Sequence, residues 1–295
     1  MKKFKFLLII LLCGVLFLTC TETDPLTGKT TMAFVSNSEL FTSSFTQYSE
    51  FLSSSTEVKT GKDAEMVKRL GDKISAAAQK WYTSIGEPKY LKDYKWEYHL
   101  VKDDQVNAWC MPGGKIVVYT GIIPVAGNED ALAVVMGHEV AHALLNHGKQ
   151  KVSAGLLQQL GAMGLSLTAA LLGFGETSQA LFMSLYGVGS TVFGTLPFSR
   201  ECEEEADHYG LILMAIAGYD PEAAEPFWQN MASMSGGTGS KIEEFLSTHP
   251  SSDSRASALR ELTPEAKKRA AKLRIDAMKP SITQAKKIAA EINGQ

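Results

Sequence analysis

The sequence is poor in cysteine and carries no excess of positive charge. Two of its four cysteines, Cys13 and Cys20, lie in the N-terminal leader or directly after it, which leaves Cys110 and Cys202. Two cysteines cannot form a disulfide framework in a chain of this size, and we expect two buried free thiols, with one disulfide as the alternative. The net charge of −3 and the lack of a basic patch argue against nucleic acid as a partner.

The composition is otherwise that of a folded globular protein, with 45% hydrophobic and 21% charged residues. No internal repeat is visible. About 275 residues follow the leader, which is enough for one large domain with its own core. These properties favour one globular unit after a removable leader.

The most informative motif is His138-Glu139-Val140-Ala141-His142, an H-E-x-x-H run inside a strongly helical stretch. Positions four apart share one face of a helix, so both imidazoles can hold one metal ion. Glu139 lies one step round the helix and can reach an activated water without being a ligand. This is the geometry of a zinc peptidase, in which the carboxylate takes the proton of the water. A helix that merely carries two histidines is the plain alternative.

A catalytic zinc ion needs a third protein ligand and keeps a fourth position for water. A third histidine at the spacing that metzincins use is absent, because Gly148 stands at that position. His147 follows five residues after His142, which predicts that it points away from the metal at a helix end near Gly148. The third ligand is therefore expected from another part of the chain.

An acidic segment, S-R-E-C-E-E-E-A-D over residues 199–207, contains the best candidates. Acidic residues often begin a helix simply because its dipole favours them. However, Glu203 and Asp207 are four apart and share a face with apolar residues further along the helix. We predict Glu203 as the third ligand, with Glu204 as the competing candidate. Asp207 is expected to accept a hydrogen bond from the outer N–H of a zinc-binding histidine.

With these two motifs in this order, the chain resembles peptidase family M48, a family of zinc metallopeptidases with HtpX-, BepA- and LoiP-like members. The third-ligand motif of the family, S-R-x-x-E-x-E-A-D, matches residues 199–207. Residues 107–114 are similar to its N-A-x-x-x-P-G-G segment, and residues 248–255 to its T-H-P-x-x-x-x-R segment. The resemblance covers residues 24–262, and it points to the bacterial envelope lipoprotein branch of the family.

The resemblance implies a mostly helical α+β fold of the zincin-like (gluzincin) type, with a small β-sheet beside the H-E-x-x-H helix and one Zn²⁺ per chain. It implies that the strand at Asn107 and Ala108 pairs with a peptide substrate, where an ordinary hairpin is the alternative. His249 would either steady the oxyanion or occupy the open metal position as a latch. Arg255 is expected to pair with the acidic helix.

The first residues have the pattern of a targeting segment. Three lysines precede an apolar run over residues 6–18, which is short for a membrane span and typical of a signal peptide. The following L-T-C sequence resembles the cleavage site of a bacterial lipoprotein, with Cys20 as the lipidated residue. Simple cleavage nearby and an uncleaved anchor are the alternatives. This pattern predicts a lipid-anchored protein on the periplasmic side of the bacterial envelope, at the outer membrane.

We expect four parts along the chain: a lipoprotein signal peptide over residues 1–19, a tether over 20–35, a zinc metallopeptidase domain over 36–262 and C-terminal helices over 263–295. Residues 152–199 are nearly free of charge. We interpret them as buried or cleft-covering helices, with a membrane hairpin as the alternative.

Local patterns place the individual elements. Asn128 is expected to cap the metal-binding helix, which should end near Gly148. Alternating aromatic residues from Tyr94 to Leu100 predict a strand. The other expected elements are a helix from a capping box at Ser36 to about residue 54, an amphipathic helix over residues 63–81, a strand over 115–119, and helix starts at Pro221 and Pro264.

The predicted function is zinc-dependent hydrolysis of peptide bonds. A lipid-anchored position favours quality control, with unfolded, misfolded or misassembled envelope and outer-membrane proteins as substrates. The main alternative is an envelope chaperone or assembly factor with a latched, weakly active zinc site. A purely structural zinc site is disfavoured because Glu139 would then have no task.

Overall fold

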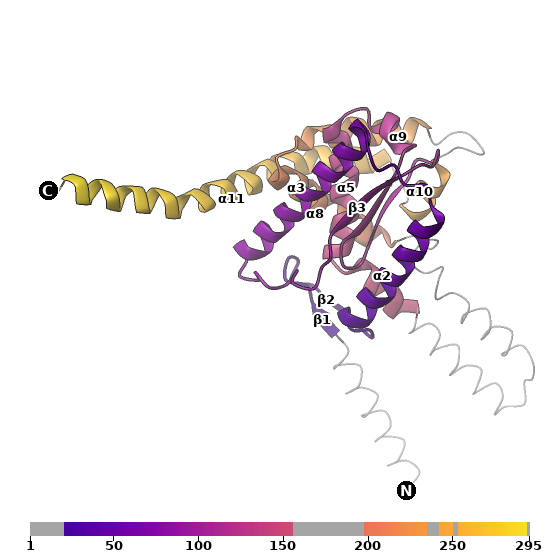
Figure 1. The fold of residues 1–295 in the computed structure, drawn as a ribbon, viewed down its shortest axis with the longest axis horizontal. Coiled ribbons are helices and arrows are strands. Elements are labelled where there is room, and N and C mark those ends of the chain that lie inside the picture. The colour runs from indigo at the N-terminus through magenta and orange to yellow at the C-terminus, as the bar shows by residue number, and fades with distance from the viewer. Residues whose placement is uncertain (1–20, 156–197, 235–241, 250–252, 294–295) are drawn as a thin grey trace, which may run out of the picture.

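A three-stranded β-sheet with helices on both faces forms the centre of the computed structural model, which describes residues 21–155, 198–234, 242–249 and 253–293 (Figure 1). The strands are β3 (Glu97–Val101), β4 (Ala108–Met111) and β5 (Lys115–Tyr119). Their order is β3-β5-β4, with β3 parallel and β4 antiparallel to β5. As the central strand, β5 is buried along its whole length.

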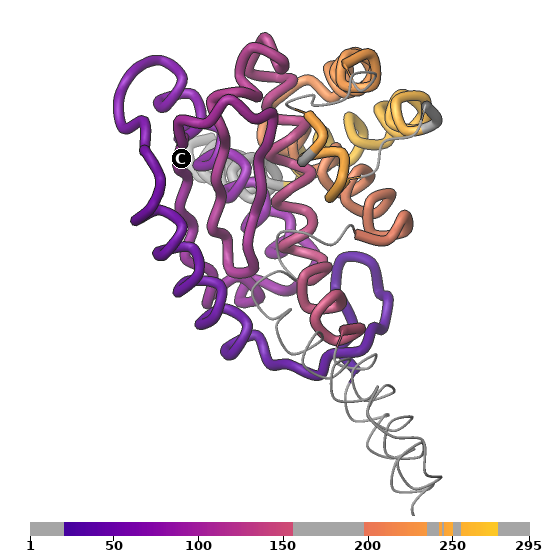
Figure 2. The backbone as a smooth tube through the Cα atoms, turned by 90° about the vertical axis from the view of Figure 1, so that its right-hand side faces the viewer, coloured from indigo at the N-terminus to yellow at the C-terminus, as the bar shows by residue number. Residues whose placement is uncertain are grey.

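Helix α2 (Asn37–Ser54) covers one face of the sheet, as the tube in Figure 2 shows. It begins with the predicted capping box: the Ser36 hydroxyl accepts from the Glu39 N–H at 3.2 Å, and the Glu39 carboxylate accepts from the Ser36 N–H at 3.0 Å. Alternate strand residues face this helix because successive side chains of a strand point to opposite sides. The resulting cluster contains Tyr48, Phe51, Leu52, Val101, Trp109, Met111, Val117 and Tyr119.

The other face of the sheet packs on α3 (Lys62–Ser84) and α5 (Glu129–Leu144), where the main core lies. Helix α3 is amphipathic as predicted. Strand β3 begins later than expected, so Tyr94 and Trp96 precede it, although both still pack against the core. The main core includes Val67, Leu70, Ile74 and Trp81 from α3 and Leu100, Ile116 and Val118 from the strands.

Helix α8 (Arg200–Ala217) packs closely along α5, and two glycines permit the approach. A Cβ atom on Gly210 would lie 2.8 Å from the backbone nitrogen of His138, and one on Gly137 would lie 2.8 Å from the carbonyl oxygen of Gly210. Contacts this short do not occur in packed interiors, so a larger residue would push the helices apart. The packing therefore brings the acidic side chains of α8 close to the histidines of α5.

The remaining described helical elements are short except for the last. Asp220 caps the turn that begins at Pro221, as predicted, and its carboxylate accepts from the Glu222 N–H at 3.2 Å. These elements are α4 (Ile122–Ala126), a helix over residues 147–155, the 3-10 turn η2 (Pro221–Ala223), α9 (Ala224–Met234), α10 (Glu243–Thr248) and α11 (Asp253–Asn293).

Helix α11 differs from the predicted C-terminal helices. It runs unbroken from Asp253 to Asn293, and its end extends away from the other elements (Figure 1). The expected helix start at Pro264 is therefore wrong. Leu259, Ala266 and Ala270 are buried in the core on both sides of the proline. This packing carries the helix past the local start signal, and the Thr263 hydroxyl donates to the Leu259 carbonyl at 3.0 Å.

Residues 21–32 form a β-hairpin, which corrects the predicted tether. Strand β1 (Thr21–Thr23) pairs antiparallel with β2 (Thr30–Met32). In the turn between them, the Asp24 carboxylate accepts from the backbone N–H groups of Leu26 and Thr27, at 2.9 and 3.0 Å. Leu26 packs against the main core. Local turn chemistry and a packed leucine hold this segment on the domain.

Some predictions fall on residues outside the described ranges: the signal peptide, Cys20 and all but the ends of residues 152–199. Among the described helices, none is both long and apolar enough to cross a membrane. Cys110 and Cys202 are both free thiols, as expected, although Cys110 is only partly buried. The predicted fold class is confirmed: the protein is mostly helical, with a small sheet beside the H-E-x-x-H helix.

Candidate active site

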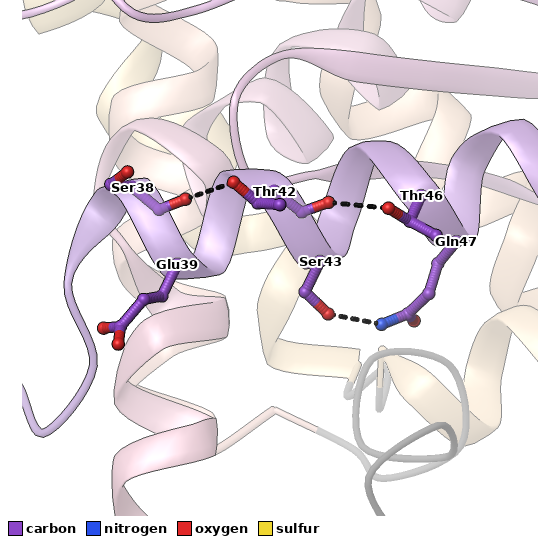
Figure 3. A pocket seen from close by; sticks show the side chains of 6 residues that line it. All are labelled: Ser38, Glu39, Thr42, Ser43, Thr46 and Gln47. Atoms are coloured by element: carbon purple, nitrogen blue, oxygen red, sulfur yellow. Dashed lines mark hydrogen bonds between the residues drawn. The ribbon is translucent and has the colours of Figure 1, made fainter.

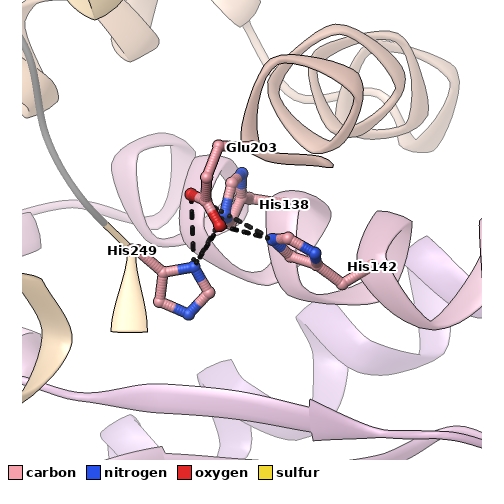
Figure 4. A group of neighbouring side chains, drawn as sticks. All are labelled: His138, His142, Glu203 and His249. Atoms are coloured by element: carbon pink, nitrogen blue, oxygen red, sulfur yellow. Dashed lines mark hydrogen bonds and ion pairs between the residues drawn. The ribbon is translucent and has the colours of Figure 1, made fainter. Parts of the chain in front are cut away.

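Helix α5 places His138 and His142 in the interior, one turn apart. Its N-terminus is fixed as predicted, because the Asn128 side chain accepts from the Ala131 N–H at 2.9 Å. Each histidine is 2% exposed, and their Nε2 atoms lie 3.0 Å apart (Figure 4). Two ring nitrogens that face each other in this way can each offer a lone pair to one cation.

Helix α8 directs Glu203 at both rings. Its Oε1 lies 3.3 Å from His142 Nε2, and its Oε2 lies 3.4 Å from His138 Nε2. The helix begins at its N-cap Ser199, whose hydroxyl accepts from the Cys202 N–H at 3.2 Å. Glu204 is exposed on the other side of α8. The structure therefore places the predicted ligand Glu203 at the site and its competitor Glu204 away from it.

His249 reaches the same point from the end of α10. Its Nδ1 lies 3.1 Å from Glu203 Oε1 and 3.3 Å from His138 Nε2. Its Nε2 lies 3.3 Å from Glu139 Oε1. The ring is 3% exposed, and its backbone N–H donates to the Phe245 carbonyl at 2.8 Å. His249 thus faces both the histidine pair and the predicted catalytic base.

The four side chains drawn in Figure 4 offer ligand atoms that all lie within 4.8 Å of one another. Among the three predicted zinc ligands, the closest separations are 3.0–3.4 Å. Ligand atoms about 2.0–2.1 Å from a tetrahedral zinc ion would lie about 3.3–3.4 Å apart. Two imidazoles and one carboxylate are also a known ligand set of catalytic zinc. The residues therefore fit a zinc ion.

Glu139 lies beside this group without belonging to it. Its carboxylate is 2% exposed, and its Oε1 atom makes no hydrogen bond within the described residues. Burial raises the pKa of the Glu139 carboxyl, and the charges of His249 and His138 counteract this in part. Its Oε1 has the ionic contact with His249 Nε2 but no hydrogen bond within the described residues, which is unusual for a buried oxygen. The position suits a group that takes a proton from a water molecule.

Burial and hydrogen bonds shift the pKa values of the other site residues. Burial opposes the charged form of Glu203, but its hydrogen bonds with the site histidines lower its pKa below the usual range. Burial lowers the pKa of His142 well below its ordinary value. For His138, burial and Arg255 favour the neutral ring, but hydrogen bonds to Asp207 and Glu203 dominate and raise its pKa to about 9. A metal ion and a proton therefore compete for His138.

A second layer of side chains supports His138. Asp207 Oδ1 lies 3.0 Å from His138 Nδ1, which is the contact predicted from the sequence. Arg255 donates to both oxygens of Asp207, at 2.5 and 2.8 Å. The guanidinium stacks 3.6 Å over the ring of Trp228. The expected pairing of Arg255 with the acidic helix is present, and it fixes the carboxylate that orients His138.

His147 was misjudged from the sequence. It does not belong to the ligand group, as predicted, but it is not a residue at the end of the metal helix. Helix α5 ends at Leu144, and a new helix covers residues 147–155. His147 is fully buried, with Nδ1 only 2.8 Å from His142 Nδ1. The signal that could reveal this is Asn146, a residue type that tolerates the left-handed backbone seen there, with φ 55°.

The predicted substrate strand lies next to α5. Within the described residues, β4 pairs only with β5, so its other edge is not covered by a strand. Ala108 begins β4 and is 1% exposed, while Asn107 precedes it and its carbonyl accepts from the Tyr119 N–H at 3.0 Å. The arrangement leaves an edge strand beside α5, and the pairing of a substrate with this edge stays a prediction.

A groove elsewhere on the surface has no part in this site. It runs along the exposed side of α2, and its polar groups are engaged locally (Figure 3). The hydroxyls of Thr42 and Thr46 donate to the helix carbonyls of Ser38 and Thr42, at 2.8 and 3.0 Å. The Gln47 amide donates to Ser43 Oγ at 2.9 Å. None of the residues that line this groove is a candidate ligand.

Comparisons with known proteins agree with this geometry. The family described as "Peptidase family M48" matches residues 69–263. The mitochondrial metalloendopeptidase OMA1 of Schizosaccharomyces pombe is 38% identical over 60% of this chain and 49% of its own length. That of Arabidopsis thaliana is 34% identical over 69% of this chain and 39% of its own length. The β-barrel assembly-enhancing protease of Yersinia pestis is 31% identical over 66% of this chain and 38% of its own length. The chain thus spans about half or less of the length of these relatives.

These relatives correct the predicted location. The two with the higher identity are mitochondrial proteins, and the bacterial protease is the more distant of the three. The assignment to the bacterial lipoprotein branch is not supported, and the prediction of a lipid-anchored protein on the periplasmic side of the outer membrane is wrong. A basic start followed by an apolar run is shared by targeting segments of several kinds, so it does not identify a compartment.

Proposed function

The chain belongs to peptidase family M48, and from this premise we propose that it is a zinc-dependent endopeptidase. The observation that carries the proposal is the buried group of His138, His142 and Glu203, with the buried carboxylate of Glu139 beside it. A structural zinc site would have no use for a further buried carboxylate that is not a ligand. An endopeptidase needs that group as its base.

His138, His142 and Glu203 would hold a zinc ion, which would supply Lewis acidity towards a water molecule and the scissile carbonyl. Asp207 keeps the His138 ring oriented. Glu139 accepts the proton of the attacking water and passes it to the leaving amine. Its raised pKa favours the first of these steps, because a carboxylate with a higher pKa takes up a proton more readily.

We extend the proposal to the substrate class, which is unfolded or misassembled protein. A peptide can reach the site by pairing its backbone with the outer edge of β4, close to α5. Such pairing requires an extended segment, which a folded protein does not present and an unfolded one does. The Yersinia pestis relative is named as a protease that enhances β-barrel assembly, and this name supports a role of the chain in protein quality control.

The proposal is tested by incubating the purified full chain with unfolded casein and with a folded globular control protein. We expect cleavage of casein and not of the control, loss of cleavage with a zinc chelator, and its return when zinc is added. Cleavage that continues in excess chelator, with zinc removal verified by elemental analysis, would contradict the proposal.

One observation favours a second candidate, in which the site is latched and the protein acts mainly as a chaperone or assembly factor. His249 Nδ1 belongs to the same ligand group as the three zinc ligands, and all four residues are at most 4% exposed. A fourth side chain at the metal would occupy the position that water and substrate need. Removal of this ring would then open the site.

We therefore expect His249→Ala to keep its zinc and to cleave casein faster than the unchanged chain. The measurement is the initial rate of casein cleavage at equal zinc content. Slower cleavage with zinc retained would contradict the latch and would assign His249 to the oxyanion instead.

A further inference from the structure

A short turn brings His147 back beneath the metal ligand His142. Helix α5 ends at Leu144, Asn146 adopts a left-handed backbone with φ 55°, and its side chain donates to the Tyr90 hydroxyl at 2.8 Å. The chain then re-enters a helix at residue 147. As a result, the His147 ring is fully buried and lies edge-on to the His142 ring, with centroids 4.9 Å apart.

The hydrogen bonds around His147 have one consistent direction. His142 Nε2 faces Glu203 and His138, so in the metal-binding tautomer its proton is on Nδ1. That proton points at His147 Nδ1, 2.8 Å away, which must accept it. The proton of the neutral His147 ring is then on Nε2, from which it is donated to Glu205 Oε2 at 3.1 Å. Each ring nitrogen has one role, and no donor faces another donor.

The last acceptor of this chain is itself held by a lysine. Lys29 Nζ donates to Glu205 Oε1 at 3.1 Å and to Glu201 Oε1 at 2.6 Å. Lys29 follows the turn of the N-terminal hairpin, which is attached to the domain at other points. Lys149 donates to Glu22 of β1, and Tyr209 of α8 donates to the Leu26 carbonyl at 3.4 Å. The hairpin therefore presents Lys29 to α8 from a fixed position.

We propose that His147, Glu205 and Lys29 form a positioning chain for the metal ligand His142, equivalent to the pair of Asp207 and Arg255 behind His138. The proposal rests on the proposed zinc site. His147 selects the tautomer of His142 that presents Nε2 to the metal, and Glu205 selects the tautomer of His147. Lys29 fixes Glu205, so the N-terminal hairpin contributes to the metal site without touching it.

The test compares two substitutions of the same residue in the full chain. His147→Phe keeps a ring but removes both bonds, whereas His147→Asn keeps an acceptor close to the position of Nδ1. We expect His147→Phe to lower the zinc affinity about 10- to 100-fold, which is the usual effect of losing a side chain that supports a metal ligand. His147→Asn should recover part of that loss. Zinc affinity is measured by competition with a chromophoric chelator.

A second readout separates positioning from general stability. The visible absorption of the Co²⁺-loaded protein reports the arrangement of the ligands, and it should change in His147→Phe and not in a variant that is merely less stable. The matched control is His208→Phe on α8, since His208 also pairs with a glutamate, Glu265 of α11, at 3.2 Å. His208→Phe should leave both the zinc affinity and the Co²⁺ spectrum unchanged.

Glu205→Ala is the second variant in case His147→Phe does not fold, because Glu205 is partly exposed. Glu205→Ala should also lower the zinc affinity, and Lys29→Met should lower it to a smaller extent. Unchanged zinc affinity and an unchanged Co²⁺ spectrum in a folded His147→Phe or Glu205→Ala variant would overturn the positioning chain. Failure of the unchanged chain to bind zinc would instead overturn the proposed function.

Discussion

At the scale of single residues, two buried carboxylates of the site have opposite environments. Glu203 is surrounded by three imidazoles, which lower its pKa and keep it charged. Glu139 Oε1 lies 3.3 Å from His249 Nε2, and burial raises the pKa of the Glu139 carboxyl. Two groups of the same type thus suit two tasks, a permanently charged metal ligand and a carboxyl that takes up and releases a proton.

The ligand role of Glu203 predicts a sharp contrast along α8. Glu203→Gln should lose zinc, because the amide is neutral and a poor ligand, whereas Glu204→Gln should keep the affinity of the unchanged chain since Glu204 is exposed. We expect Glu203→Gln to lose more than the roughly 10- to 100-fold typical of groups behind a ligand. Zinc titration of both variants measures this, and an empty site in Glu204→Gln would contradict the assignment.

At the scale of elements, the site depends on how closely α5 and α8 approach. Gly210 and Gly137 leave no room for a Cβ atom between the helices, and the residue next to Gly137 is the ligand His138. A methyl group at this contact must move one helix backbone, because the nearest atoms belong to the backbone rather than to a flexible side chain. The packing and the ligand geometry are therefore linked.

We expect Gly210→Ala to lower the free energy of unfolding by about 1–3 kcal/mol, the usual cost of overpacking. It should also lower the zinc affinity, because Glu203 moves away from the histidines. Gly155→Ala is the matched control, since a Cβ there meets nothing within 4 Å. Urea unfolding and zinc titration of both variants measure the effect. Equal stability and zinc affinity in the two variants would show that the close contact has no such role.

Comparison with the sequence shows which elements local signals can predict. The capping box of α2 and strand β5 were predicted correctly, because their signals lie within the segments themselves. Asn146, by contrast, interrupts the helix that an H-E-x-x-H pattern alone would extend to His147, and only the three-dimensional turn shows where that ring lies. The hairpin at residues 21–32 and the uninterrupted α11 likewise depend on packing against distant residues.

At the scale of the whole molecule, the proposed metal site connects segments that are far apart in the sequence. His138 lies on α5, Glu203 on α8 and His249 after α10. The side chains that support the predicted ligands extend these connections. Arg255 of α11 pairs with Asp207, and Lys29 of the N-terminal hairpin pairs with Glu205. A ligand that binds the folded chain at such a site stabilises all of these segments together.

Zinc should therefore raise the melting temperature of the whole domain. At a free zinc concentration of 100 times the dissociation constant, the added stability is about 2.7 kcal/mol. Calorimetry of the full chain with and without a chelator measures the shift. Glu203→Gln should melt at the same temperature in both conditions, and a chelator that left the melting of the unchanged chain unaltered would contradict the proposed site.

The most direct test of the central claim is the casein-cleaving activity of Glu139→Gln at matched zinc content. The account predicts that this variant keeps one zinc ion per chain and loses activity by about 10²- to 10⁴-fold, because only proton transfer is removed. Loss of zinc in parallel with activity would show that Glu139 is a ligand. Full activity with zinc bound would show that the chain does not use Glu139 as its base, and it would contradict the account.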